Sequence, residues 1–196
     1  HQQYPNYEII AVNDGSKEVY ICRTDQLIIP GAHNVENALA AAAISYFAGG
    51  ERSVRGETLR SFRGVEHRLE FVEEIDGIRF VNDSKGTNPD SSIKAVEAMK
   101  GEIVLIAGGY DKGGDFDHLI KAFDGKVKAL VLLGKTASKI KETAEKIGFT
   151  DIKMVKDMDE AVRAAYGLAS PGDTVLLSPA CASWDMYTCF EQRGEH

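Results

Sequence analysis

The feature that most constrains the fold is the alternation, from residue 78 to residue 177, of short apolar runs with longer amphipathic segments. Continuously apolar strands between amphipathic helices are typical of a parallel sheet with both faces covered. The sequence therefore predicts an α/β, Rossmann-like domain whose ligands bind at the carboxyl ends of the strands. The predicted strands are 78–82, 103–107, 127–133, 152–155 and 174–177, and the predicted helices are 89–99, 116–123, 137–147 and 158–168.

The segment before residue 64 is smaller and has a partial α+β pattern. The β-rich runs 7–12 and 18–22 flank Asn13-Asp14-Gly15-Ser16, whose turn-forming residues predict a hairpin. We place a domain boundary near Gly64, because the pattern changes there to a second predicted hairpin with its turn at Asp76-Gly77.

An Ala-rich helix is expected from about Gly31 to Phe47, followed by a second helix at 53–62. Asn34 suits the N-cap of the first helix, and Asn37, three residues later, is placed to reach back toward it. The alternative is a binding role, in which two amides on one helix face present donors and acceptors to a heterocycle. The residues alone leave both interpretations open.

Composition narrows the class of protein. With 43% apolar and 27% charged residues and no long apolar run, the 196-residue chain is expected to be soluble, without a membrane partner. The net charge of −7 disfavours a nucleic-acid partner, because phosphate binding needs a basic surface. Cys22, Cys181 and Cys189 have no metal-site spacing, so we expect no metal site and a reducing, cytoplasmic setting. We expect Cys181 to be a small buried thiol rather than a nucleophile.

A polar run at 82–88 follows one predicted strand and precedes a predicted helix. Asn88-Pro89 suits the N-cap and the first helical position, so the strand presents Asp83, Lys85 and Thr87 beside a helix N-terminus, which favours anions. A carboxylate, an ammonium and a hydroxyl together can bind a ligand that carries both charge and hydroxyl groups. The alternative is a polar turn in which Asp and Thr bond the backbone and Lys is solvated.

Two further strand ends carry unusual residues. In the Gly-rich run 108–115, Lys112 offers a point charge to a carboxylate or phosphate, although a flexible loop with a solvated lysine is the alternative. The run 178–185 has small residues that let a ligand approach the backbone, and Ser183 adds a hydroxyl. Taken alone, Trp184 is expected in the core, since aromatic residues usually pack. The glycine spacing fits no dinucleotide fingerprint, so a nicotinamide cofactor is not supported.

Taken together, these stretches resemble the Mur ligase family, ATP-dependent amide ligases that build the peptidoglycan stem peptide. The likeness extends in order over nearly the whole chain and is greatest to the members that add D-glutamate. The matching stretches are 31–38, 62–70, 82–88, 108–112, 177–185 and 190–194.

The resemblance implies that residues 1–63 are the tail of a central ATPase domain and that 64–196 form the C-terminal domain that receives the amino acid. It implies ATP, Mg²⁺, D-glutamate and UDP-MurNAc-L-alanine as cofactors and substrates, with the Mg²⁺ ligands outside this chain, in a monomer serving peptidoglycan synthesis. It places Lys85 at the reaction centre. The other implied positions are Thr87, Lys112, Ser183, the backbone of Trp184 and Phe190 for D-glutamate, and Asn34, Asn37, Arg68 and Asp83 for the nucleotide.

This sequence also departs from the family pattern. Gly86 replaces a frequent Ala, which we expect to be benign. Trp184 replaces a frequent Leu, so the resemblance does not define that wall of the pocket. No Gly-x-x-x-x-Gly-Lys-[Ser/Thr] phosphate loop occurs, the chain begins at His1 without Met, and no closing helix is expected at its end. We therefore expect a piece of a ligase that is inactive alone. The alternatives are a folylpolyglutamate synthase-like ligase and a non-catalytic nucleotide- or partner-binding domain.

Overall fold

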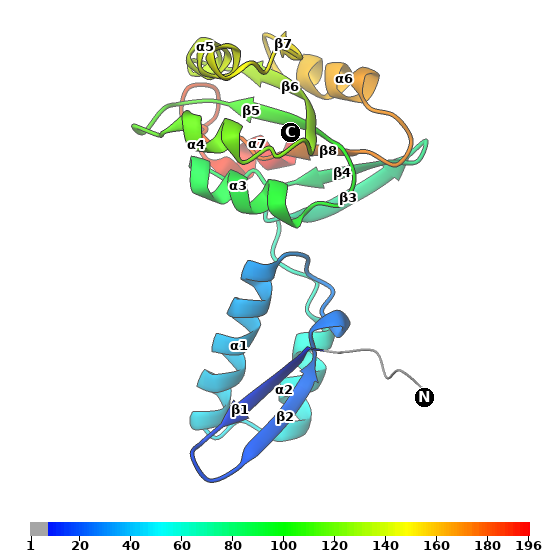
Figure 1. The fold of residues 1–196 in the computed structure, drawn as a ribbon, viewed down its shortest axis with the longest axis vertical. Helices are drawn as coiled ribbons and strands as arrows, with labels where there is room; N and C mark the ends of the chain where they lie inside the picture. Colours follow the sequence, from blue (N-terminus) through cyan, green and yellow to red (C-terminus); the bar gives the residue numbers. More distant parts are fainter. Residues whose placement is uncertain (1–7) are drawn as a thin grey trace. The chain divides into compact units, whose positions relative to one another are not determined.

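The computed structural model describes residues 8–196, which form two compact units (Figure 1). The first unit ends at Gly64 and the second begins at Val65. Tyr7, the first residue of one predicted strand, lies outside the described residues.

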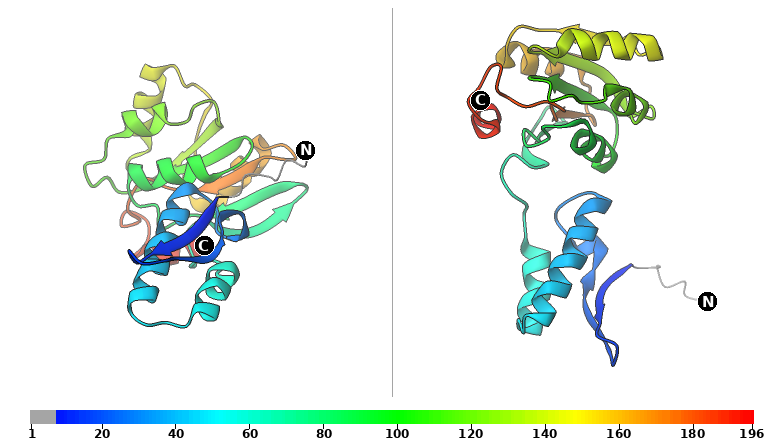
Figure 2. Two further views of the ribbon diagram at one scale, coloured as in Figure 1. Left: turned by 60° about the horizontal axis from the view of Figure 1, so that its bottom comes forward. Right: turned by 90° about the vertical axis from the view of Figure 1, so that its left-hand side faces the viewer.

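The first unit is a hairpin packed against two helices. Strands β1 and β2 pair antiparallel, and their inward side chains share an apolar core with α1 (Figure 2). Burial alternates along the hairpin because only one of its faces is covered. This unit contains β1 (Ile9–Asn13), β2 (Glu18–Arg23), the 3₁₀ turn Thr24–Gln26, α1 (Ala32–Phe47) and α2 (Arg52–Ser61).

The predicted capping role of Asn34 is wrong. Gly31 is the N-cap of α1, with a φ of 98° that an L side chain rarely adopts. Asn34 lies inside the first turn, where its side-chain amide donates to the carbonyl oxygen of Pro30 at 2.6 Å. Asn37 then donates to the Asn34 side-chain oxygen at 3.2 Å, so the two amides form a pair on one face of the helix.

The second unit is built on a six-stranded sheet in the order β3-β4-β8-β5-β6-β7. Only β3 runs antiparallel to its neighbour, so the predicted α/β fold with a mostly parallel sheet is confirmed. The strands are β3 (Glu70–Ile75), β4 (Ile78–Asn82), β5 (Ile103–Gly108), β6 (Val127–Leu133), β7 (Ile152–Met154) and β8 (Thr174–Leu177). The helices are α3 (Pro89–Ala98), α4 (Phe116–Lys121), α5 (Ala137–Ile147), α6 (Met158–Leu168) and α7 (Phe190–Glu195).

Helices cover both faces of this sheet. Alternate side chains of β5 enter different cores: Leu105 packs with α3, α4 and α5, whereas Val104 and Ile106 pack with α6. All three are at most 1% exposed. Burial on both faces is the reason these strands are continuously apolar in the sequence.

Local signals in the sequence fix two connections of the second unit. Asp76 and Gly77 both have positive φ, as the two-residue turn between β3 and β4 requires. Asn88 caps α3, accepting a hydrogen bond from the Ser91 backbone N–H at 2.9 Å, and Pro89 takes the first helical position. Both predictions are confirmed.

The expectation of no closing helix is wrong, because residues 190–195 form α7. Its backbone is tied to β4 by Asn82, whose amide donates to the Gly194 carbonyl at 3.2 Å. Among the helices of the described residues, none has the length and apolarity needed to cross a membrane.

Candidate functional site

Three chain segments that follow β4, β5 and β8 meet at one edge of the sheet. These strands are neighbours and parallel, so their carboxyl ends point the same way. Tyr110 and Ala182 exchange two backbone hydrogen bonds of 2.8 and 3.0 Å, which join the segment after β5 to the segment after β8. The backbone thus brings together residues that are far apart in the sequence.

Lys112, Thr87 and Trp184 form the first side-chain cluster at this edge. The Lys112 ammonium donates to the Thr87 hydroxyl at 3.3 Å. It also lies 5.9 Å from the centre of the Trp184 ring. The expectation that Trp184 packs in the core is wrong, because its side chain is 62% exposed.

A cavity of about 290 Å³ opens beside Thr87 and Lys112. It lies at the N-terminus of α3, whose first residues, Asn88 to Asp90, form part of its lining. A helix N-terminus and an ammonium both attract negative charge, so a carboxylate suits this position. Carboxylates of the protein also line the cavity, which gives it acceptors for a positively charged group on the same ligand.

The shape of the Lys112 loop depends on Asp111. Its carboxylate accepts hydrogen bonds from the Gly113 and Gly114 backbone N–H groups, both at 2.8 Å, and pairs with the Lys139 ammonium at 2.6 Å. The hydrogen bond from Lys139 is the largest effect holding the pKa of Asp111 below its usual value. Neither residue was predicted from the sequence, although an Asp two residues before Gly is a known turn signal.

Lys85 and Phe190 form a second cluster. The Lys85 ammonium lies 4.8 Å from the centre of the Phe190 ring, within cation–π range. Beside it, the Ser84 hydroxyl donates to the Phe190 carbonyl oxygen at 2.8 Å, which anchors the start of α7. The segments after β4 and at α7 therefore bring an ammonium and an aromatic ring together.

Arg193 was not predicted, yet it links the segments that bear the predicted ligand residues. Its guanidinium donates to the Ser84 hydroxyl (3.0 Å), the Ser84 carbonyl (2.8 Å) and the Cys181 carbonyl (3.1 Å). The side chain is 3% exposed, and burial lowers the pKa of Arg193 to about 10. No sequence pattern marks these partners, because the contacts join residues that are remote in the chain.

Asp83 is buried, at 5% exposure, rather than directed at an open cavity. Its carboxylate accepts from the Ser178 hydroxyl at 2.6 Å and from the Leu69 backbone N–H at 3.3 Å. Burial raises the pKa of Asp83 to about 6, although the hydrogen bond from Ser178 acts in the opposite direction. Ser178 in turn lies 2.9 Å from the Ser92 hydroxyl, which extends the buried network to α3.

Gly86 fits tightly against this network. A Cβ at position 86 would lie 2.5 Å from Asp83 Oδ2 and 2.7 Å from Ser178 Oγ, closer than such contacts normally occur. Glycine therefore fits this position, whereas an alanine here would push on the Asp83–Ser178 hydrogen bond.

Ser183 and Cys181 are both buried, at 2% and 1% exposure. Ser183 lines a cavity of about 10 Å³ together with Gly109 and Arg193, and not the cavity beside Lys112. Burial raises the pKa of the Cys181 thiol to about 11, so the thiol stays protonated at neutral pH and is a poor nucleophile.

The remaining predicted residues occupy different units. Asn34 and Asn37 lie on α1 in the first unit, and the Asn37 side chain is exposed. Arg68 is exposed in the second unit, and its charge is one of the effects that lower the pKa of Asp83.

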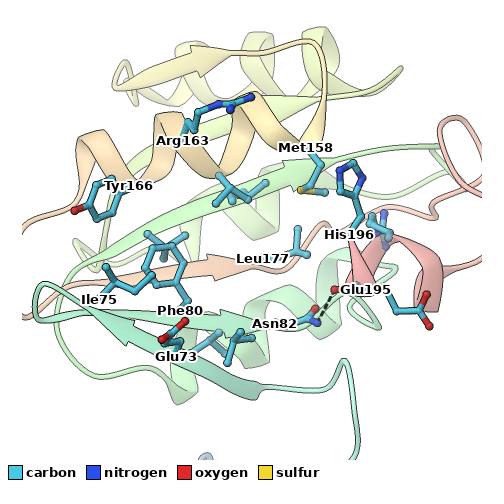
Figure 3. A pocket seen from close by; sticks show the side chains of 17 residues that line it. Glu73, Ile75, Phe80, Asn82, Met158, Arg163, Tyr166, Leu177, Glu195 and His196 are labelled. Carbon is cyan, nitrogen blue, oxygen red and sulfur yellow. Dashed lines mark hydrogen bonds between the residues drawn. The ribbon is translucent and has the colours of Figure 1, made fainter.

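The second unit also has a larger apolar hollow of about 590 Å³ on the face that carries α6. Figure 3 shows Met158 and Tyr166 of α6 above it, with Phe80 and Leu177 of the sheet below. His196 lies at its end. None of the predicted ligand residues lines it, so the chemistry points to the smaller cavity at the strand ends.

A strand-end site with a lysine, a threonine and a helix N-terminus, on a mostly parallel sheet, defines a domain suited to binding a small anionic ligand. The family model of the Mur ligase glutamate ligase domain matches residues 67–181. The chain belongs to the Mur ligase family.

Curated relatives carry the name UDP-N-acetylmuramoylalanine–D-glutamate ligase. The protein from Alkaliphilus oremlandii is 57% identical over 96% of this chain and 41% of its own length. The one from Clostridioides difficile is 51% identical over 95% of this chain and 41% of its own length. The chain thus spans less than half the length of these relatives.

Solved structures share the fold at low sequence identity. UDP-N-acetylmuramate-alanine ligase from Thermotoga maritima has a TM-score of 0.68 at 20% identity, covering 90% of this chain and 41% of that chain. Folylpolyglutamate synthase from Mycobacterium tuberculosis has a TM-score of 0.65 at 16% identity, covering 90% and 45%. At these identities, the likeness concerns the fold alone.

Proposed function

We propose that this chain is part of an ATP-dependent ligase that adds D-glutamate to UDP-MurNAc-L-alanine in peptidoglycan synthesis. The names of the relatives support the substrate pair. The observation that carries the proposal is the Lys112 ammonium, 3.3 Å from the Thr87 hydroxyl beside a cavity at the N-terminus of α3. That grouping suits the α-carboxylate of an amino acid.

The reaction proceeds through an acyl phosphate. The γ-phosphoryl group of ATP passes to the carboxylate of UDP-MurNAc-L-alanine, which turns one oxygen into a leaving group. The amine of D-glutamate then attacks the acyl carbon, an amide bond forms, and the C–O bond to phosphate breaks. The amine loses a proton to the solvent in this step, and the products are the amide, ADP and phosphate.

The residues of this chain orient the incoming amino acid. Thr87 and Lys112 bind its α-carboxylate, and Ser183, the Trp184 backbone and Phe190 form the pocket for its side-chain carboxylate. Binding both carboxylates leaves the amine as the free nucleophile, and holding it in line with the acyl carbon contributes several kcal/mol to catalysis. Ser183 reaches the pocket only if its surroundings rearrange, because its side chain is buried here.

Lys85 acts at the reaction centre. Its ammonium offsets the negative charge that accumulates when a carboxylate is phosphorylated beside ATP. Phe190, 4.8 Å away, holds the ammonium by a cation–π contact and excludes water from one side of it.

Each unit has its own candidate residues for a nucleotide contact. Asn37 is exposed and suits a contact with the adenine ring, with Asn34 orienting it through their hydrogen bond. Arg68 is an exposed cation suited to a phosphate. Asp83 does not fit a direct ribose contact as it stands, because its carboxylate is buried on Ser178 and Leu69.

The Mg²⁺ that offsets phosphate charge in the ligase is held by residues outside this chain. Within residues 8–196, no group of three or more His, Cys, Asp or Glu side chains is arranged to hold a metal ion. The sequence also lacks the phosphate loop, so the chain alone is expected to be inactive. We propose a cytoplasmic monomer for the full-length ligase.

Amino-acid selectivity of the full-length protein tests this function. Phosphate release in the presence of ATP and UDP-MurNAc-L-alanine should depend on D-glutamate, with L-glutamate and D-aspartate at least tenfold poorer in kcat/KM. Equal rates with all three amino acids, or no dependence on any of them, would refute the proposal.

A further inference from the structure

Trp184 lies mostly outside the core, so burial does not explain a tryptophan at this position. It is the only tryptophan of the chain, and its side chain is 62% exposed. Two side chains from the segment after β5 lie near its ring: the Tyr110 ring, with centroids 5.7 Å apart, and the Lys112 ammonium at 5.9 Å. Because the indole is exposed, its effect is on Tyr110 and Lys112, which it contacts, rather than on the packing of the core.

The backbone holds the two aromatic rings in register. The paired hydrogen bonds join the backbone of Tyr110 to that of Ala182, which lies two residues before Trp184. The two rings are tilted by 48°, so Tyr110 supports one side of the indole. The indole is therefore braced although most of its surface faces solvent.

Lys112 needs such a support in order to act as a ligand. A free lysine side chain on an exposed loop samples many rotamers, and fixing it costs about 1.5–2 kcal/mol. Among residues 8–196, its ammonium has one hydrogen bond to another side chain, to Thr87 at 3.3 Å, which is too weak to restrict the whole chain of methylenes. A cation–π contact at an exposed site adds about 0.5–1 kcal/mol toward holding the Lys112 side chain in one conformation.

We propose that Trp184 is a positioning residue: its indole, braced by Tyr110, holds the Lys112 ammonium at Thr87 so that the pair is preorganised for a carboxylate. This rests on the proposed function only for the identity of the ligand. It assigns a role to the Trp184 side chain, in addition to the backbone contact with the amino acid.

The positioning itself is measured without ligand, on the 196-residue chain. The order of the Lys112 ε-methylene is followed by ¹³C NMR relaxation, with the signal assigned through Lys112→Arg. Trp184→Leu and Tyr110→Ala should both raise the mobility of this methylene, while Trp184→Phe should restore most of its order. Unchanged mobility in Trp184→Leu would overturn the proposal.

A matched control is available elsewhere in the same unit. Phe71 is 54% exposed on β3, and the Arg79 guanidinium lies 5.3 Å from its ring centre. Phe71→Leu removes a similar aromatic–cation contact away from the site, and it should leave the mobility of Lys112 unchanged. A change as large as that in Trp184→Leu would show a general effect and contradict the specific role.

The consequence for the ligand is measured in the full-length ligase. Trp184→Leu should raise the KM for D-glutamate about fivefold, with the KM for ATP unchanged and with Trp184→Phe close to wild type. An unchanged KM for D-glutamate would refute the positioning role in binding. If the wild-type protein shows no D-glutamate-dependent turnover, the proposed function fails, and the relaxation experiment still decides the role of Trp184.

Discussion

The Lys112 ammonium donates a hydrogen bond of 3.3 Å to the Thr87 hydroxyl, although the two residues are 25 positions apart. They follow different strands, β4 and β5, which are separated in the sheet by β8. A lysine and a threonine that meet at strand ends beside a helix N-terminus are suited to binding a carboxylate. This pair connects the fold of the chain to its proposed chemistry.

Removing the Lys112 charge should impair amino-acid binding selectively. In the full-length ligase, Lys112→Ala should raise the KM for D-glutamate by one to two orders of magnitude, since a charge-assisted hydrogen bond contributes about 1.5–3 kcal/mol. The KM for ATP should stay nearly constant. Lys121→Ala, a change at an exposed lysine near the end of α4, is the matched control. Equal increases in both KM values would remove Lys112 from the amino-acid site.

Ionisation of Asp83 should make stability depend on pH. The folded pKa is about 6, above the value near 4 of an unfolded aspartate, so the folded state binds the proton more tightly. Stability conferred by this group is present below pH 4 and is lost as the pH rises from about 4 to 6, by an order of 2–3 kcal/mol.

Urea unfolding, followed by the fluorescence of Trp184, reports this dependence for the second unit. Asp83→Asn keeps the shape of the side chain and removes its charge, so its stability should change less over the same pH range. Identical pH profiles for the two proteins would show that Asp83 does not titrate as described. The effect of Asp83→Asn on the ATP affinity of the full-length ligase, measured by calorimetry, distinguishes a buried structural role of Asp83 from a contact with the ribose.

Arg193 should be irreplaceable even by lysine. Three different guanidinium nitrogens donate to the Ser84 hydroxyl, the Ser84 carbonyl and the Cys181 carbonyl. The three N–H groups of an ammonium radiate from one atom and do not match this spread, so Arg193→Lys leaves buried acceptors unpaired. We expect a loss of about 2–3 kcal/mol in the free energy of unfolding of the second unit. Arg163→Lys, at an exposed arginine of α6, is the control and should change little. Equal stabilities of the two variants would contradict the linking role of Arg193.

The isolated chain should not hydrolyse ATP. It lacks the glycine-rich loop and lysine that bind the β- and γ-phosphates in ATPases of this type. A phosphate-release assay should give the rate of the blank, while the full-length ligase with its substrates should turn over. Sustained hydrolysis by the purified chain, lost on mutation of Lys85, would show a phosphate site that the sequence does not reveal.

The sequence predicted the sheet well because each of its signals is local. Continuous apolar runs mark strands buried on both faces, and Asn88-Pro89 marks the start of α3 through the needs of its own first turn. The N-cap of α1 was mispredicted because two local choices compete there. Gly31, with its positive φ, takes the N-cap position, so the helix begins at Ala32 and Asn34 lies inside its first turn.

The site was predicted only in part, for a different reason. Lys112 and Thr87 were recognisable as polar groups at strand ends, where ligands bind in this type of sheet. Arg193 was not, because its partners, Ser84 and Cys181, become neighbours only when the sheet has formed. Trp184 was expected in the core on the general preference of aromatic residues, which does not account for a ring that faces a cation.

The most direct test of the account is a double-mutant cycle on Thr87 and Lys112, with the KM for D-glutamate of the full-length ligase as the readout. Thr87→Val and Lys112→Ala should each raise this KM, and the double variant should be no worse than about threefold above Lys112→Ala, since both groups bind one carboxylate. If the two effects on the KM instead multiply in full, the residues act independently, and the single carboxylate site described here does not exist.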